Sequence, residues 1–149
     1  EYEESIYLDG NIRILSEDFF SLIKKKDLFI STKHLRRNCL YEEAKECKKL
    51  KLEKKEIIDK QIEIIKKAGF PKNYGLYEAN ILYRKHNEEK IIKLDEEWWD
   101  FVSKQAKRDQ LSLTYICWKN NIPFRTFLDI SFRKKNKYIE ITPHLVKRK

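Results

Sequence analysis

The central stretch of the sequence is 75-GLYEANILYRK-85, which mixes apolar, aromatic and polar residues without the periodicity of a helix. We expect a strand over residues 76–84 that enters the core of the protein. Glu78 and Asn80 are two positions apart, so they would share one face of this strand. A buried carboxylate is unfavourable without partners, and the pair therefore indicates a binding site within an otherwise apolar element.

Other strands and helices are expected on both sides of this strand. Before it, the sequence predicts strands over 5–8 and 12–15, a helix over 16–26 with Ser16 as N-cap, a strand over 28–32, a helix over 41–50, and a second helix that ends before Gly69. After it, the sequence predicts a helix capped by Asn87, a helix over 109–119, and strands over 123–128 and 137–142. Because strands and helices interleave without repeats or linkers, we expect a single α/β domain with a mixed β-sheet flanked by helices.

The composition is that of a globular protein with a positive charge. The 149 residues are 41% hydrophobic and 13% aromatic, and no apolar run approaches the roughly 20 residues that cross a bilayer. The net charge of +9 suggests an anionic partner such as a phosphate-bearing ligand, a membrane surface or nucleic acid, although biased codon usage would also enrich lysine. With only three glycines, the chain cannot contain the glycine-rich motifs of dinucleotide-binding proteins or P-loop NTPases.

The cysteines indicate free thiols. Cys39, Cys47 and Cys117 are odd in number and lack a CxxC spacing, which fits a reducing compartment better than a disulfide framework or a zinc site. We therefore expect a cytoplasmic location, which allows association with the inner face of the membrane.

Asp9-Gly10-Asn11 interrupts two predicted strands. Strand ends face the crevice in which α/β proteins bind ligands, and a carboxylate and an amide at this point suit Mg²⁺ or Mn²⁺. Gly10 would permit close approach of the backbone. The same tripeptide is common in β-turns, so a purely structural turn is the alternative.

Two further clusters carry charge. Lys33, His34 and Arg37 follow a predicted strand, where they could hold phosphate or carboxylate oxygens or simply form a solvated loop. Asp109, which lies between Arg108 and Gln110 in the sequence, is the first residue of a predicted helix. Its carboxylate could cap the helix, or it could bind and activate a hydroxyl group.

These segments together resemble the GT-A type glycosyltransferases, whose Asp-x-Asp motif lies between two apolar strands as Asp9-Gly10-Asn11 does, with Asn11 in place of the second aspartate. More closely, the chain is similar to a glycosyltransferase-like family found in bacterial capsular polysaccharide biosynthesis proteins and in plant proteins of mucilage and pollen. The segments that carry this resemblance are Tyr-x-Asp-Gly-Asn at 7–11; His34 with Arg37, Tyr41 and Glu43; Gly75-Leu76 with Glu78 and Asn80; and Arg108-Asp109-Gln110-Leu111-Ser112.

The resemblance implies a metal-dependent transferase with a nucleotide-sugar donor and a glycan or glycolipid acceptor, acting in capsular or cell-surface polysaccharide biosynthesis. It implies Mn²⁺ or Mg²⁺ at Asp9, Asn11 and His144, with Asp109 and Glu78 as the catalytic carboxylates. The substrate-binding residues would be Lys33, His34, Arg37, Asn80, Arg108 and Gln110. The chain lacks methionine, so we expect it to be the C-terminal part of a longer GT-A (Rossmann-like) domain whose nucleotide-binding half precedes Glu1.

Two other functions remain open from the sequence. Lysine runs at 24–26, 48–55 and 134–137 could contact phosphates in a nucleic-acid-binding module. These runs follow no known binding motif, and glutamates are interleaved with the lysines, so we do not expect a nucleic-acid partner. A catalytically inactive structural fragment is the other alternative, because a truncated sheet would have open edges.

Overall fold

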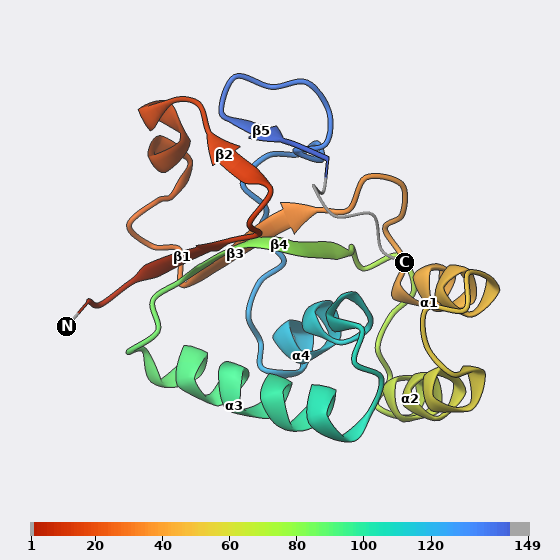
Figure 1. Ribbon diagram of the computed structural model, residues 1–149. Coiled ribbons are helices and arrows are strands. Elements are labelled where there is room, and N and C mark those ends of the chain that lie inside the picture. Colours follow the sequence, from red (N-terminus) through yellow and green to blue (C-terminus); the bar gives the residue numbers. More distant parts are fainter. Residues whose placement is uncertain (1, 144–149) are drawn as a thin grey trace.

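The computed structural model of the chain describes residues 2–143 and is layered around a small β-sheet (Figure 1). The strands are β1 (Ser5–Leu8), β2 (Ile12–Ile14), β3 (Phe29–Lys33), β4 (Tyr77–Arg84) and β5 (Ile139–Ile141). The helices are α1 (Leu40–Lys49), α2 (Lys55–Lys67), α3 (Glu89–Lys104) and α4 (Leu113–Lys119), with short 3-10 helices η1 (Glu17–Leu22) and η2 (Asp109–Leu111). The predicted α/β fold class is confirmed.

Strand β4, which contains most of the central stretch of the sequence, is the middle strand of the sheet. The order is β1-β4-β3 with both pairings antiparallel, and β4 is buried from Tyr77 to Tyr83. A separate antiparallel ribbon joins β2 to β5. The parallel component of the expected mixed sheet is an isolated bridge between Ser31 and Thr126.

A register shift interrupts the pairing of β3 with β4. Ser31 is opposite Leu82, but the next residue, Thr32, is opposite Glu78, so residues 79–81 of β4 form a bulge. The Ser31 hydroxyl lies 3.1 Å from the carbonyl oxygen of Glu78 and 3.0 Å from that of Ile81. This side chain thereby replaces ladder hydrogen bonds that the bulge removes.

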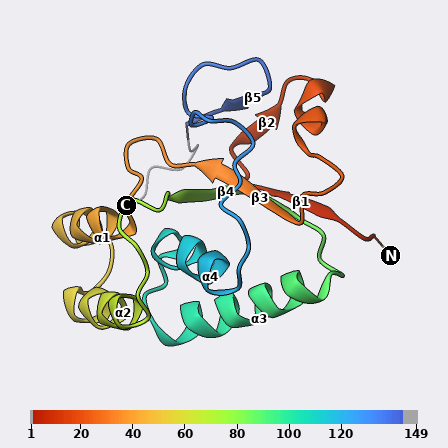
Figure 2. The ribbon, with the colours of Figure 1, turned by 180° about the vertical axis from the view of Figure 1, so that it is seen from behind.

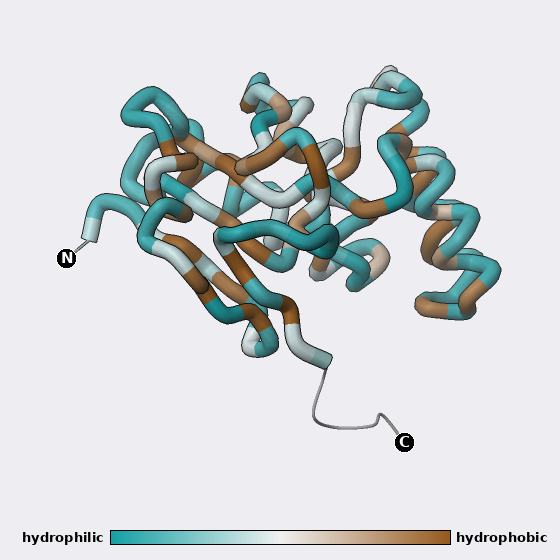
Figure 3. The backbone as a smooth tube through the Cα atoms, turned by 90° about the horizontal axis from the view of Figure 1, so that it is seen from above, coloured by the Kyte–Doolittle hydropathy of each residue, from teal (hydrophilic) through white to brown (hydrophobic). Residues whose placement is uncertain are grey.

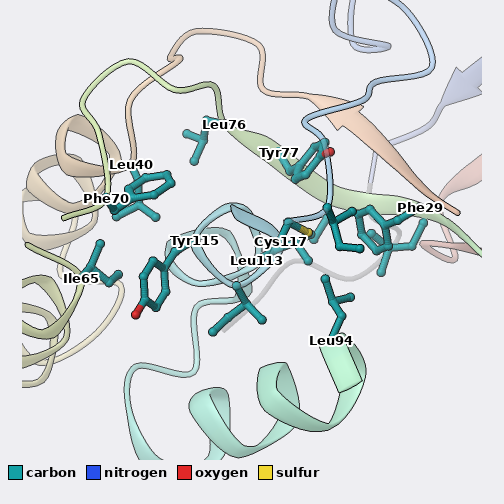
Figure 4. Packing of buried hydrophobic residues seen from close by; sticks show 14 of the residues in the cluster. Phe29, Leu40, Ile65, Phe70, Leu76, Tyr77, Leu94, Leu113, Tyr115 and Cys117 are labelled. Atoms are coloured by element: carbon teal, nitrogen blue, oxygen red, sulfur yellow. The ribbon is translucent and has the colours of Figure 1, made fainter. Parts of the chain in front are cut away.

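Three apolar cores hold the layers together. The largest lies between the sheet and the helices α3 and α4, and Figures 1 and 2 both show these helices on the same side of the sheet. Its packed residues include Phe29, Phe70, Leu76, Tyr77, Leu94, Leu113 and Tyr115 (Figure 4). A second core joins the other face of the sheet to η1 and the β2–β5 ribbon through Phe19, Ile81, Phe127 and Phe132. A third core joins α1, α2 and η2 beside the end of the sheet.

The helices α1, α2 and α4 end in the same way. In each, the residue after the C-cap has a positive φ, and its N–H and that of the next residue donate to carbonyls of the last turn, as in a Schellman motif. The residues with positive φ are Lys51, Gly69 and Asn121. From above, hydrophilic segments dominate the outer loops of the molecule (Figure 3). Within residues 2–143, no helix is both long enough and apolar enough to span a membrane.

Two predicted helices differ from the structure. The helix expected over 16–26 is only the 3-10 helix η1, although Ser16 is its N-cap as predicted, with its hydroxyl accepting from the Asp18 N–H. The Asp27 carboxylate accepts from the backbone N–H of Lys24, which closes a turn in place of a further helical turn. The N-cap of α3 is Glu88, because the amide of Asn87 donates instead to the carbonyl of Tyr2.

Two further segments also differ. The helix expected over 109–119 is divided into η2 and α4 at Ser112, whose hydroxyl lies 3.0 Å from the carbonyl oxygen of Asp109. The strand expected over 123–128 is reduced to the bridge at Thr126. The C-terminal strand is confirmed as β5, which pairs with β2.

Candidate functional site

Polar groups from three strands meet where β1 ends. The backbone N–H of Asp9 donates to the carbonyl of Asn80 at 2.9 Å, which extends the β1–β4 pairing and places Asp9 beside β4. The hydroxyl of Thr32 contacts both the Glu78 carbonyl and the Asn80 side-chain oxygen. Since that oxygen is engaged by Thr32, the Asn80 amide nitrogen remains as a donor for a ligand. The Tyr7 hydroxyl donates to Oδ1 of Asp9 at 2.9 Å.

Glu78 has one engaged and one unengaged oxygen. Its side chain is 6% exposed, and Oε1 accepts from Nε and Nη2 of Arg133, each at 2.5 Å. Its other oxygen, Oε2, is buried and has no hydrogen-bond partner within residues 2–143. The Arg133 side chain is 45% exposed. A buried acceptor without a partner is costly, so this geometry favours a ligand that donates to Glu78 beside an accessible cation.

Glu43 on α1 connects the cationic loop to the helices. Its Oε2 atom lies 3.5 Å from Nε2 of His34 and 3.3 Å from Nη1 of Arg37. Its Oε1 accepts from the Cys47 thiol at 3.7 Å. Burial raises the pKa of that thiol to about 11, with the Glu43 charge adding to the rise and the Arg108 charge opposing it. Arg108 therefore lies beside the buried side of α1.

His34 is held as a neutral acceptor. Its Nδ1 accepts from the backbone N–H groups of Arg36 and Arg37 at 3.3 and 3.1 Å, which is possible only when Nδ1 carries no proton. Burial lowers the pKa of His34, and the charges of Arg37 and Arg133 lower it further, whereas those of Glu43 and Glu78 oppose this. His34 thus shapes the loop that presents Arg37.

Asp109 is the first residue of η2, with Arg108 at the N-cap position. Its Oδ1 accepts from the backbone N–H of Gln110 at 2.8 Å. Burial raises the pKa of the Asp109 carboxyl, and the charge of Asp9 adds to the increase, while the Gln110 N–H and the Arg108 charge oppose it. Two carboxylates from distant parts of the chain, Asp9 and Asp109, therefore influence each other at the end of β1.

Gln61 on α2 fixes the loop that carries Arg108 and Asp109. Its side chain is fully buried and donates to the carbonyl of Leu111 at 2.6 Å, while its oxygen accepts from the N–H of Ala106 at 2.9 Å. Both ends of the loop over residues 106–111 are thus bound to a single side chain. No other fully buried glutamine or asparagine occurs within residues 2–143.

The expected metal ligands are placed as follows. Oδ2 of Asp9 makes no hydrogen bond within residues 2–143 and remains open to a cation. The Asn11 amide nitrogen donates to the carbonyl of Thr142 at 2.8 Å, so this side chain ties β2 to the segment after β5. His144 lies outside the described residues. Among those that are described, no group of three or more His, Cys, Asp or Glu residues is arranged to hold a metal ion.

The remaining expected substrate-binding residues are Lys33 and Gln110. Both are half-buried beside His34 and Asp109 respectively, and neither side chain makes a hydrogen bond in the described part of the chain.

Sequence reasoning missed Arg133, Thr32 and Gln61. Only Gln61 had a signal, a polar residue within the apolar stripe of a helix, whereas Arg133 is hidden in a basic run. The three cysteines are free, as predicted, and all three are buried.

Replacing Gln61 with leucine should destabilise the protein and loosen the loop over residues 106–111. The change leaves the buried Ala106 N–H and Leu111 carbonyl unpaired, which costs about 2–4 kcal/mol. Urea unfolding and amide hydrogen exchange at Ala106 measure both effects. Gln105→Leu is the matched control, because Oε1 of Gln105 is buried without a partner and its removal should be nearly neutral. Equal losses of unfolding free energy in the two variants would contradict this role of Gln61.

His34 should make stability depend on pH. Its pKa is lowered on folding from the ordinary value of 6.5, so the unfolded chain binds the proton first. The contribution is present above pH 6.5 and declines below it, by up to about 1.4 kcal/mol per pH unit. Unfolding free energies of wild type and His34→Asn between pH 8 and 5 test this, because asparagine keeps an acceptor for the loop N–H groups without titrating. Parallel curves for the two proteins would contradict the assignment.

Comparison with known proteins identifies the family of the chain. A family model described as TOD1/MUCI70, glycosyltransferase-like domain, matches residues 2–141. No curated protein matches the chain, and no solved structure matches it. The family match covers β1 to β5 and includes every candidate site residue except His144. The chain therefore belongs to the TOD1/MUCI70 glycosyltransferase-like domain family.

Proposed function

We propose that the chain belongs to an enzyme that transfers a sugar from a nucleotide-diphosphate donor. The observation that carries this proposal is the buried, unpaired Oε2 of Glu78 beside the exposed guanidinium of Arg133. A sugar hydroxyl would supply the donor that Glu78 lacks, and a diphosphate would supply the anion that Arg133 can bind. Membership of a glycosyltransferase-like family supports this pairing of ligands.

Asp9 is the residue best suited to hold Mn²⁺ or Mg²⁺. Its Oδ2 is open, Asp109 adds negative charge nearby, and hard cations favour carboxylate and amide oxygens. One open carboxylate oxygen is thus available to such a cation, and Asn11 and His144 are further candidate ligands. A divalent cation at this point would neutralise charge that develops on the departing diphosphate.

The carboxylates and the Asn80 amide would position the sugars. Glu78 and Asn80 present an acceptor and a donor from the same strand, as binding of neighbouring hydroxyl groups requires. The raised pKa of Asp109 makes it a stronger base than an ordinary aspartate, which suits a residue that binds or activates a sugar hydroxyl. Gln61 would keep Asp109 in place through the loop that it binds.

The cations would hold the phosphates of the donor. Arg133 contacts Glu78 through one edge of its guanidinium only. The charges of Arg37 and Arg133 both act on His34, which follows Lys33, and Arg108 lies beside Cys47 of α1. We propose a glycan or glycolipid acceptor and a role in capsular or cell-surface polysaccharide biosynthesis, in the cytoplasm and at the inner face of the membrane.

Calorimetric titration with Mn²⁺ and a panel of nucleotide sugars tests the proposal. The full-length natural protein should bind at least one nucleotide sugar only when Mn²⁺ is present. Asp9→Asn should weaken that binding about 10- to 100-fold, because one charged interaction of about 1.5–3 kcal/mol is lost. The matched control is Asp100→Asn, since Asp100 is exposed on α3, where it pairs with Lys104, and this change should leave binding unchanged.

Two results would contradict the proposal. Equal losses in Asp9→Asn and Asp100→Asn would show that the site is elsewhere. Absence of nucleotide-sugar binding together with salt-sensitive binding of RNA or DNA would favour the nucleic-acid function that the lysine runs allow.

A further inference from the structure

The turn between α1 and α2 combines charge with exposed apolar side chains. It comprises residues 48–55, KKLKLEKK, with five lysines and one glutamate for a net charge of +4. Leu50 is 56% exposed and Leu52 is 45% exposed, although both belong to a residue type that is usually buried. We name these eight residues the α1–α2 turn.

The backbone of this turn is fixed and displays the two leucines at a helix end. The N–H of Lys51 donates to the Lys48 carbonyl at 3.2 Å, and the N–H of Leu52 donates to the Cys47 carbonyl at 3.0 Å. Lys51 has a φ of 53°, which is costly for a residue with a side chain, and glycine is the usual residue there. The chain thus carries a lysine where the conformation favours glycine.

Some charged side chains of the turn have partners within the protein and others do not. The two carboxylate oxygens of Glu53 accept from the backbone N–H groups of Lys54 and Lys107. Lys48 pairs with Asp59. The other four lysines, 49, 51, 54 and 55, are exposed and take part in none of the ion pairs found within residues 2–143. The outward surface is therefore cationic around an apolar centre.

We infer that the α1–α2 turn docks on an anionic lipid surface. A cluster of four or more lysines supplies about 1 kcal/mol of attraction per charge at such a surface, and apolar side chains that enter the interface supply a second signal. Charge complementarity would also allow nucleic acid, but phosphate contacts give no function to Leu50 and Leu52. The combination of both features fits a lipid surface better.

The α1–α2 turn lies close to the proposed site, so docking of the turn would bring that site to the lipid surface. Seven residues of α-helix separate Glu43 from Leu50, a distance of roughly 10 Å along α1. Glu53 bonds to the N–H of Lys107, within the loop that carries Arg108 and Asp109. Docking would hold this loop close to the head groups of the lipid, where the sugar of a glycolipid acceptor lies. This purpose rests on the proposed transferase function, whereas the lipid binding itself does not.

Vesicle flotation of the intact chain tests the inference without any catalytic assay. The wild type should float with vesicles of phosphatidylcholine and phosphatidylglycerol, and not with phosphatidylcholine alone. Replacing Lys49, Lys51 and Lys54 with glutamine should lower partitioning about 100-fold, at about fivefold for each lysine. Leu50→Ser should lower it about five- to tenfold. Circular dichroism establishes that each variant is folded.

The control replaces the exposed lysines 66, 67 and 72 with glutamine, which removes the same charge near the opposite end of α2 and should change partitioning only a few fold. Three results would overturn the inference. The first is no flotation with anionic vesicles, and the second is an equal loss in the control. The third is binding of RNA that depends on the lysines of the turn, together with no effect of Leu50→Ser on binding of either vesicles or RNA. Failure of sugar transfer with flotation intact would count only against the proposed function.

Discussion

The structure of the site depends on the bulge between β3 and β4. Without it, strict alternation along β4 would place Ala79 and Leu82 on opposite faces, yet both belong to the core beneath the sheet. The hydroxyl groups of Ser31 and Thr32 contact the carbonyl oxygens of Glu78 and Ile81 that the interrupted ladder leaves free, and Thr32 also contacts the side-chain oxygen of Asn80. A central, fully buried strand can therefore carry two polar side chains, Glu78 and Asn80, at the edge where β1 ends.

The charges around this edge come from segments far apart in the sequence. Asp9, Glu78 and Asp109 supply negative charge, and Arg108 and Arg133 supply positive charge beside it. The loops that carry these residues are fixed by neutral groups: a histidine whose Nδ1 accepts two backbone N–H groups, and a buried glutamine that binds both ends of residues 106–111. Such fixed dipoles and charges suit the binding of a phosphorylated sugar, because little reorganisation is required when the ligand arrives.

Much of the fold could be predicted from local sequence. The central strand, α1, α2 and the strands around Asp9 follow from apolar patterns, and the family resemblance follows from short motifs at 7–11 and 108–112. Contacts between distant residues could not be predicted. The Asp27 carboxylate ends η1 early by closing a turn, Asn87 bonds to Tyr2 in place of capping α3, and Arg133 reaches Glu78 across 55 positions of sequence. No local pattern encodes these partners, and the bulge likewise depends on which strand lies beside β4.

The most direct test of the central claim is an NMR experiment with Mn²⁺, in the presence and absence of uridine or guanosine diphosphate. Paramagnetic Mn²⁺ broadens the amide signals nearest to it. If the end of β1 is the metal and diphosphate site, broadening should centre on Gly10, Asn80 and Gln110 and strengthen when the nucleotide is added. Broadening centred away from these residues, or unaffected by either nucleotide, would contradict a nucleotide-sugar site at the end of β1.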